Sequence, residues 1–107
     1  MIRPLDRDPI LDESCQYHER ARRQCLRKAA KFADLRNRVY DTIDRVRSHK
    51  LKEYFRRALH EVMSMQEYEM ACADYHTKML LHWNNCQRPG YVNHAVPRVP
   101  QLPVFML

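Results

Sequence analysis

Four cysteines are the residues in this chain whose type and spacing could do chemistry. Cys15 and Cys25 form a C-x9-C pair, and Cys72 and Cys86 form a C-x13-C pair much later in the chain. Four thiols can close two disulfides in three different pairings, or they can bind a metal. A third alternative is that all four stay reduced and pack as small apolar side chains.

Zinc is the metal to consider, because histidines accompany three of the cysteines at helical spacing. The pairs are Cys15 with His18, Cys72 with His76, and His82 with Cys86. Spacings of three or four residues place both side chains of a pair on one helix face. The compact ligand knuckles of structural zinc sites are missing, so we favour disulfides and expect no metal.

The sequence has none of the common catalytic motifs. It lacks a glycine-rich phosphate loop, an HExxH motif, a nucleophile elbow and the C-x-x-C pair of thiol oxidoreductases. Its six histidines are scattered among residues typical of a solvated helix. We therefore expect a protein that is not an enzyme, with no catalytic residue and no cofactor.

The cysteines lie in a long segment that predicts helix. Residues 10–88 contain neither Gly nor Pro and are rich in strong helix formers. One straight helix of that length would extend about 119 Å, far beyond the globular range, so the segment should fold back on itself. The most polar stretch predicts the bend near residues 48–50, with Ser48 capping the second helix. Ser64 begins a capping-box pattern, so a second break there is an alternative.

Seam residues recur at heptad spacing on both sides of this bend, as along the contact line of paired helices. The first seam comprises Cys15, His18, Arg22, Cys25, Ala29, Phe32, Arg36, Val39, Ile43 and Val46. The second comprises Leu51, Phe55, Ala58, Val62, Met65, Glu69, Cys72, His76, Met79, Trp83 and Cys86. Together they predict an all-α fold, an antiparallel helical hairpin.

The hairpin suggests how the cysteines pair. The midpoint of Cys25 and Cys72 and that of Cys15 and Cys86 both fall between residues 48 and 51, close to the bend. Folding there places inner against inner and outer against outer cysteine, with an offset of about 6 Å to absorb. Each disulfide across a loop of about 47 residues or more could contribute around 4 kcal/mol.

The ends of the chain differ from the helical segment. We divide the chain into an N-terminal lead (1–9), the hairpin (10–88) and a C-terminal arm (89–107) whose prolines predict an extended conformation. The arm is apolar, so we expect it to lie in a groove of another subunit, with a flexible end as the alternative. The residues expected to contact the partner are Val99, Leu102, Val104, Phe105 and Leu107.

The chain is basic, with 19 Lys and Arg against 13 Asp and Glu and a net charge of +6. We expect a basic surface on the first helix, formed by Arg20, Arg23, Arg27, Lys28 and Lys31. It could meet acidic proteins, cardiolipin headgroups or RNA, or be a solvated face. We see no secretory signal and no run of 18 apolar residues, so we expect no transmembrane span.

Paired cysteines on two antiparallel helices resemble the coiled-coil-helix-coiled-coil-helix proteins of the mitochondrial intermembrane space. The resemblance rests on Cys15, Cys25, Cys72 and Cys86. It implies nested disulfides, a location peripheral to the inner membrane, and a role as a structural accessory subunit of a respiratory complex, with protein partners. Two alternatives are an RNA-associated accessory subunit of the mitochondrial ribosome, although nucleic acid is the weaker hypothesis, and an assembly factor of the same cysteine-paired class.

Overall fold

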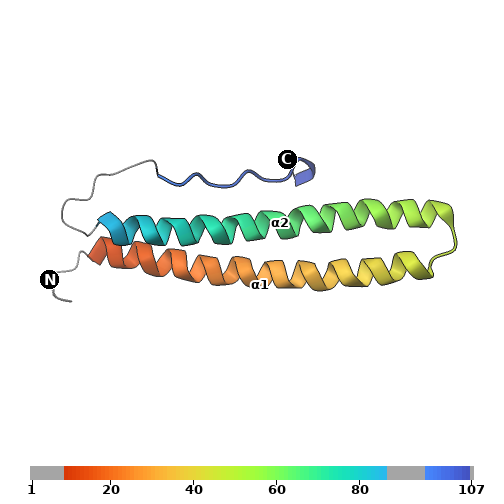
Figure 1. Ribbon diagram of the computed structural model, residues 1–107, viewed down its shortest axis with the longest axis horizontal. Coiled ribbons are helices and arrows are strands. Elements are labelled where there is room, and N and C mark those ends of the chain that lie inside the picture. The colour runs from red at the N-terminus through yellow and green to blue at the C-terminus, as the bar shows by residue number, and fades with distance from the viewer. Residues whose placement is uncertain (1–8, 87–95, 107) are drawn as a thin grey trace.

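The computed structural model describes residues 9–86 and 96–106 of the chain. Helix α1 (Pro9–Arg45) and helix α2 (His49–Cys86) lie side by side and antiparallel along their whole length (Figure 1). A single 3-10 turn, η2 (Val104–Met106), lies near the C-terminus. No strand occurs among the described residues. The predicted all-α architecture of two packed helices is thus confirmed.

The two helices are joined by three residues, 46–48. Helical backbone hydrogen bonds reach into this connection from both sides, from Val46 N to Thr42 O and from Lys52 N to Ser48 O, both at 3.0 Å. The connection between the helices is therefore short. The Leu51 amide faces Ser48 Oγ at 3.5 Å, the position expected for an N-cap. Ser48 therefore caps α2 as predicted, and because the cap must precede the helix, the bend lies slightly earlier than residues 48–50.

Helix α2 runs without a break through Ser64. The Ser64 hydroxyl donates to the carbonyl oxygen of His60 at 2.9 Å, a bond that a serine inside a helix can make. The alternative of a second break at Ser64 is therefore wrong. The capping-box pattern is overridden because α2 keeps packing against α1 on both sides of this position.

The contact between the helices is long and thin. The molecule measures 66 × 23 × 18 Å, and its buried apolar residues are Ala29, Ala73 and Met79. No described side chain is less than 2% exposed. Two helices alone cannot enclose a side chain on all sides, so this hairpin has little core of its own.

Several seam positions depart from an apolar contact line. His18, Glu69 and His82 are buried although they are polar. Arg36 donates to Gln66 Oε1 across the interface at 3.1 Å, which makes a polar layer in the middle of the hairpin. Leu51, predicted to lie on the second seam, is 50% exposed because it is in the first turn after the bend, where α1 has ended.

The C-terminal segment returns along α2. Residues 96–103 have no regular secondary structure, and η2 shows that the end of the segment is not fully extended. In Figure 1 this segment lies on the side of α2 that faces away from α1. Residues 89–95 and 107 of the predicted arm fall outside the described residues. Neither helix contains a stretch apolar enough to span a bilayer among the residues described.

Candidate functional site at the cysteine end of the hairpin

The chemistry-bearing residues gather in the half of the hairpin remote from the bend. Within it, α1 carries Cys15, His18 and Cys25, and α2 carries Glu69, Cys72, His76, His82 and Cys86. All but His82 lie at predicted seam positions; His82 is buried although the heptad pattern placed its neighbour Trp83 on the seam instead. We refer to these eight residues as the polar seam.

The inner cysteines lie opposite each other. Burial raises the pKa of the Cys25 thiol to about 11, and the negative charges of Glu69 and Cys72 and a hydrogen bond with Glu69 act in the same direction. A hydrogen bond with Cys72 is the main cause that raises the pKa of Tyr68. The structure therefore brings Cys25, Cys72, Glu69 and Tyr68 together, with the Glu69 carboxyl buried.

Two histidines meet across the interface, farther from the bend than the inner cysteines. His18 Nδ1 and His76 Nδ1 are 2.8 Å apart, so one ring donates its N–H and the other accepts it. The rings of Tyr17 and Tyr75 present edges to these imidazoles, with centroid distances between 5.0 and 6.1 Å. Burial lowers the pKa of both histidines, and the His76 charge further lowers that of His18. The pair is thus a neutral, aromatic-lined contact between the helices.

The outer cysteines are placed differently from the inner pair. Cys15 lines a small cavity of about 360 Å³ together with Leu80 and Asn84 of α2. Cys86 lies at the end of α2, with its Sγ 3.7 Å from Nε2 of His82, which is buried. Leu80 and Asn84, the α2 residues that line this cavity with Cys15, precede Cys86 by six and two residues.

All four cysteines are thiols in this structure, so the two predicted disulfides are not part of it. The contacts of Cys25 and the position of Cys15 show which residues lie near each of these cysteines, and do not show a bond. The zinc alternative has no ligand set in the described residues, where no three His, Cys, Asp or Glu side chains converge on a common point. The polar seam is an interhelical contact, with His18 against His76 and Cys25 beside Glu69.

The predicted basic surface is exposed on α1. All five of its residues are solvent-accessible, and among the described residues the only ion pair that involves one of them joins Arg23 to Glu19 at 2.8 Å. That ion pair is exposed and contributes little to stability. The remaining cations, Arg20, Arg27, Lys28 and Lys31, are available to a partner.

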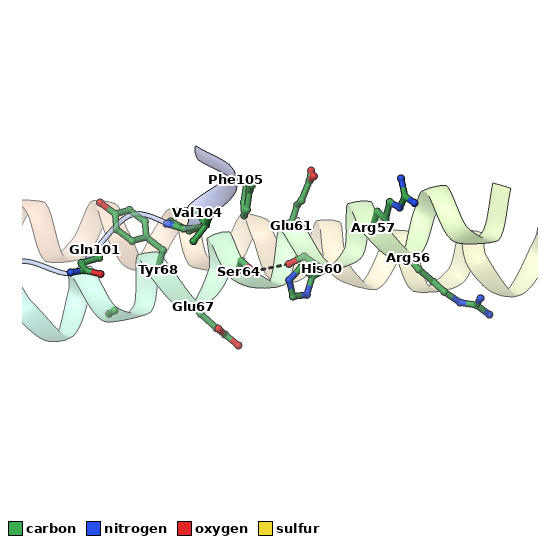
Figure 2. Close-up of a pocket in the computed structure, with 12 residues that line it drawn as sticks. Arg56, Arg57, His60, Glu61, Ser64, Glu67, Tyr68, Gln101, Val104 and Phe105 are labelled. Carbon is green, nitrogen blue, oxygen red and sulfur yellow. Dashed lines mark hydrogen bonds between the residues drawn. The ribbon is translucent and has the colours of Figure 1, made fainter. Parts of the chain in front are cut away.

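The predicted partner-binding residues lie along α2. Val99, Leu102, Val104 and Phe105 are exposed by 68%, 42%, 85% and 46%, whereas Leu107 is outside the described residues. Val104 and Phe105 help to line a groove of about 910 Å³ between this segment and the α2 residues from Arg56 to Ala71 (Figure 2). The segment therefore contacts its own α2 and still leaves much apolar surface in water.

Sequence reasoning did not foresee the partners of the polar seam. Glu69 was placed on the seam as a polar gap, yet it is the buried acceptor beside Cys25. Tyr17 and Tyr75 received no role. Each tyrosine directly precedes a seam histidine in the sequence, and this position could have indicated that its ring flanks the contact between the two imidazoles.

Comparison with known proteins returned no family model, no curated protein and no solved structure that matches this chain. The chain is a two-helix hairpin with cysteines and histidines at its helix interface.

Proposed function

We propose that this protein is a non-catalytic accessory subunit that clamps neighbouring subunits of a respiratory complex on the intermembrane-space side of the mitochondrial inner membrane. Its rigid part is the hairpin, closed by the disulfides Cys25–Cys72 and Cys15–Cys86. The observation that carries the proposal is the meeting of Cys25 and Cys72 across the helix interface, where their charges influence each other.

The small core gives the two proposed disulfides a physical role. With Ala29, Ala73 and Met79 as its buried apolar residues, the hairpin gains little from hydrophobic burial. A disulfide that closes the loop between Cys25 and Cys72 would add about 4 kcal/mol, a large share of the stability of a small domain. It would also remove the titratable Cys25 thiol from beside the buried Glu69 carboxyl.

The class of protein rests on the cysteine pattern. A C-x9-C arm followed by a C-x13-C arm is similar to the hinge subunit of respiratory complex III. This chain departs from that subunit in two ways, since it is basic and its inner cysteines are separated by 46 residues, which makes a long rod. We therefore propose the class, an accessory subunit, and not this particular subunit.

The C-terminal segment supplies the clamp. Its exposed apolar residues, with Val104 85% and Val99 68% in water, are an unfavourable surface for a protein that works alone. A neighbouring subunit that covers them would gain hydrophobic contact area. Because the segment lies along α2, the same neighbour would also touch the hairpin (Figure 1).

The first test is the thiol state of the native protein. Free thiols are alkylated in intact mitochondria, and the protein's mass is measured with and without prior reduction, followed by mapping of linked peptides. We expect no alkylation before reduction, and links between Cys25 and Cys72 and between Cys15 and Cys86. Immediate alkylation of all four cysteines, or any other pairing, would contradict the proposed hairpin.

The second test concerns assembly. The full chain, tagged at its N-terminus, is followed on native gels of mildly solubilised mitochondria, where we expect migration with a respiratory complex. A variant with Leu102, Val104 and Phe105 changed to Ser should lose this migration, while Arg98→Ser, a change in the same segment outside the groove, should keep it. Equal incorporation of both variants, or migration with the mitochondrial ribosome, would refute the clamp.

A further inference from the structure

We infer that the outer face of α1 is a docking surface for an anionic lipid bilayer. The inference deepens the proposed function, on which it rests only for the identity of the membrane. Three features of α1 support it: a line of cations, two exposed side chains that border this line, and the uninterrupted length of the helix.

The cations form one line. Arg20, Arg27, Lys31 and Arg38 follow one another at intervals of seven, four and seven residues, which keeps them on one side of a helix. All four are exposed, and none takes part in an ion pair among the described residues. The line extends about 27 Å, long enough to meet several lipid headgroups at once. Each cation close to an anionic surface strengthens attachment.

Two large side chains border this line. Tyr17 is 61% exposed and Leu35 is 41% exposed. They are 18 residues apart, which is five full helical turns, so both lie on the same flank of the line, where the Tyr17 ring also contacts His18 and His76. Leu35 also lies four residues after Lys31 and three before Arg38, so a cation lies about one helical turn away on each side of it, and the seam residues Phe32 and Val39 are its other helical neighbours. Tyrosine and leucine in such positions are suited to the boundary between headgroups and acyl chains.

The surrounding structure leaves this face open. The described part of the C-terminal segment runs along α2 on the side away from α1, so it does not cover the outer face of α1 (Figure 1). Helix α1 continues for 37 residues without interruption. A straight helix can lie flat on a bilayer and apply its whole line of cations to it. The long Lys and Arg side chains can reach headgroups while the helix backbone stays above them.

The same observations favour lipid over nucleic acid. RNA-binding surfaces stack bases on aromatic rings that alternate with basic residues. Between Arg20 and Arg38 the one aromatic residue is Phe32, at the helix interface, and the exposed Tyr17 and Tyr40 flank this stretch rather than alternate with its cations. An exposed leucine such as Leu35 gains nothing from a phosphate backbone but gains hydrophobic burial at a bilayer.

The test measures flotation of the full-length oxidised protein with phosphatidylcholine vesicles, prepared with or without cardiolipin. We expect binding only to the cardiolipin vesicles and weaker binding at high salt. Changing Arg20, Arg27 and Lys31 to Gln should lower the binding constant on the order of 100-fold, because each charge contributes several-fold. The matched control, with Lys50, Lys52 and Lys78 changed to Gln, removes the same charge from α2 outside the groove and should bind as the wild type does.

A further variant separates insertion from simple attraction. Leu35→Ser leaves the charge unchanged and should reduce vesicle binding several-fold, with the helix content by circular dichroism unaltered. Equal loss in the two triple variants, no effect of Leu35→Ser, or tighter binding to an RNA duplex than to the cardiolipin vesicles would each overturn the inference. Vesicle binding does not depend on assembly into a complex, so its failure and that of the proposed function are distinguishable.

Discussion

His18 Nδ1 and His76 Nδ1 lie 2.8 Å apart across the helix interface, although 58 residues separate them in the chain. The contact exists only while at least one ring can accept a proton from the other. The helices of the cysteine end are therefore joined by a hydrogen bond whose existence depends on pH.

We expect the reduced protein to lose stability as the pH falls below about 6.5, the usual histidine pKa. The pKa of His18 and that of His76 are lowered in the folded state, so the unfolded chain binds protons more readily. Stability is therefore fully present above the unfolded pKa and falls as the pH drops toward the folded values. Urea unfolding at a series of pH values measures this slope.

The control for this prediction is the variant His18→Gln with His76→Gln, in which the pH dependence below 6.5 should largely disappear. The exposed His49 and His60 serve as a second control, since replacing both with Gln should leave the slope as it is. A slope that survives the first change would show that other groups govern the acid sensitivity.

Cys25 should react more slowly with an alkylating reagent in the folded, reduced protein than in urea at neutral pH. A rise of its pKa from 9.0 to about 11 lowers its thiolate fraction by roughly 100-fold, and the thiolate is the reactive form. Replacing Glu69 with Gln removes a negative charge beside the thiol and should speed the reaction. Timed alkylation with peptide mass spectrometry follows each site, and a Cys25 that reacts as fast as it does in urea would disprove this environment.

The cap at the bend can be tested with two serines, Ser48 just before α2 and Ser64 inside it. Ser48→Ala should destabilise the hairpin by about 0.5–1 kcal/mol, because the Leu51 amide loses its acceptor. Ser64→Ala is the matched control: its hydroxyl only bonds within the helix, and alanine is the better helix former. Thermal unfolding of both variants gives the comparison, and a larger loss for Ser64→Ala would mean that the cap is unimportant.

Met79 is the largest of the buried apolar residues, at 7% exposure. Met79→Ala should lower the free energy of unfolding by about 2 kcal/mol, the lower end for a buried methionine because the thin interface can partly close. Met70, on the same helix but 50% exposed, provides the control, and Met70→Ala should cost under about 0.5 kcal/mol. Denaturant unfolding under reducing conditions measures both, and equal effects would show that α2 packs on another face.

Several features were predictable because they depend on local sequence. The long segment without Gly or Pro predicts helix, and its length requires a bend. Ser48 could be assigned as the cap since its side chain competes for the first amides of the next helix. The heptad spacing also placed His18, Cys25, Cys72 and His76 on the seams, each on its own helix.

What the sequence alone determined about this protein is therefore its pair of helices, the approximate bend and most of the residues on each seam, with Leu51 and His82 as exceptions. The tertiary structure decided which residues face each other. His18 meets His76, Cys25 meets Cys72 and Glu69, and Arg36 meets Gln66. The physical reason is that the axial register of two packed helices depends on the sum of contacts along the whole interface, which no spacing within one helix specifies.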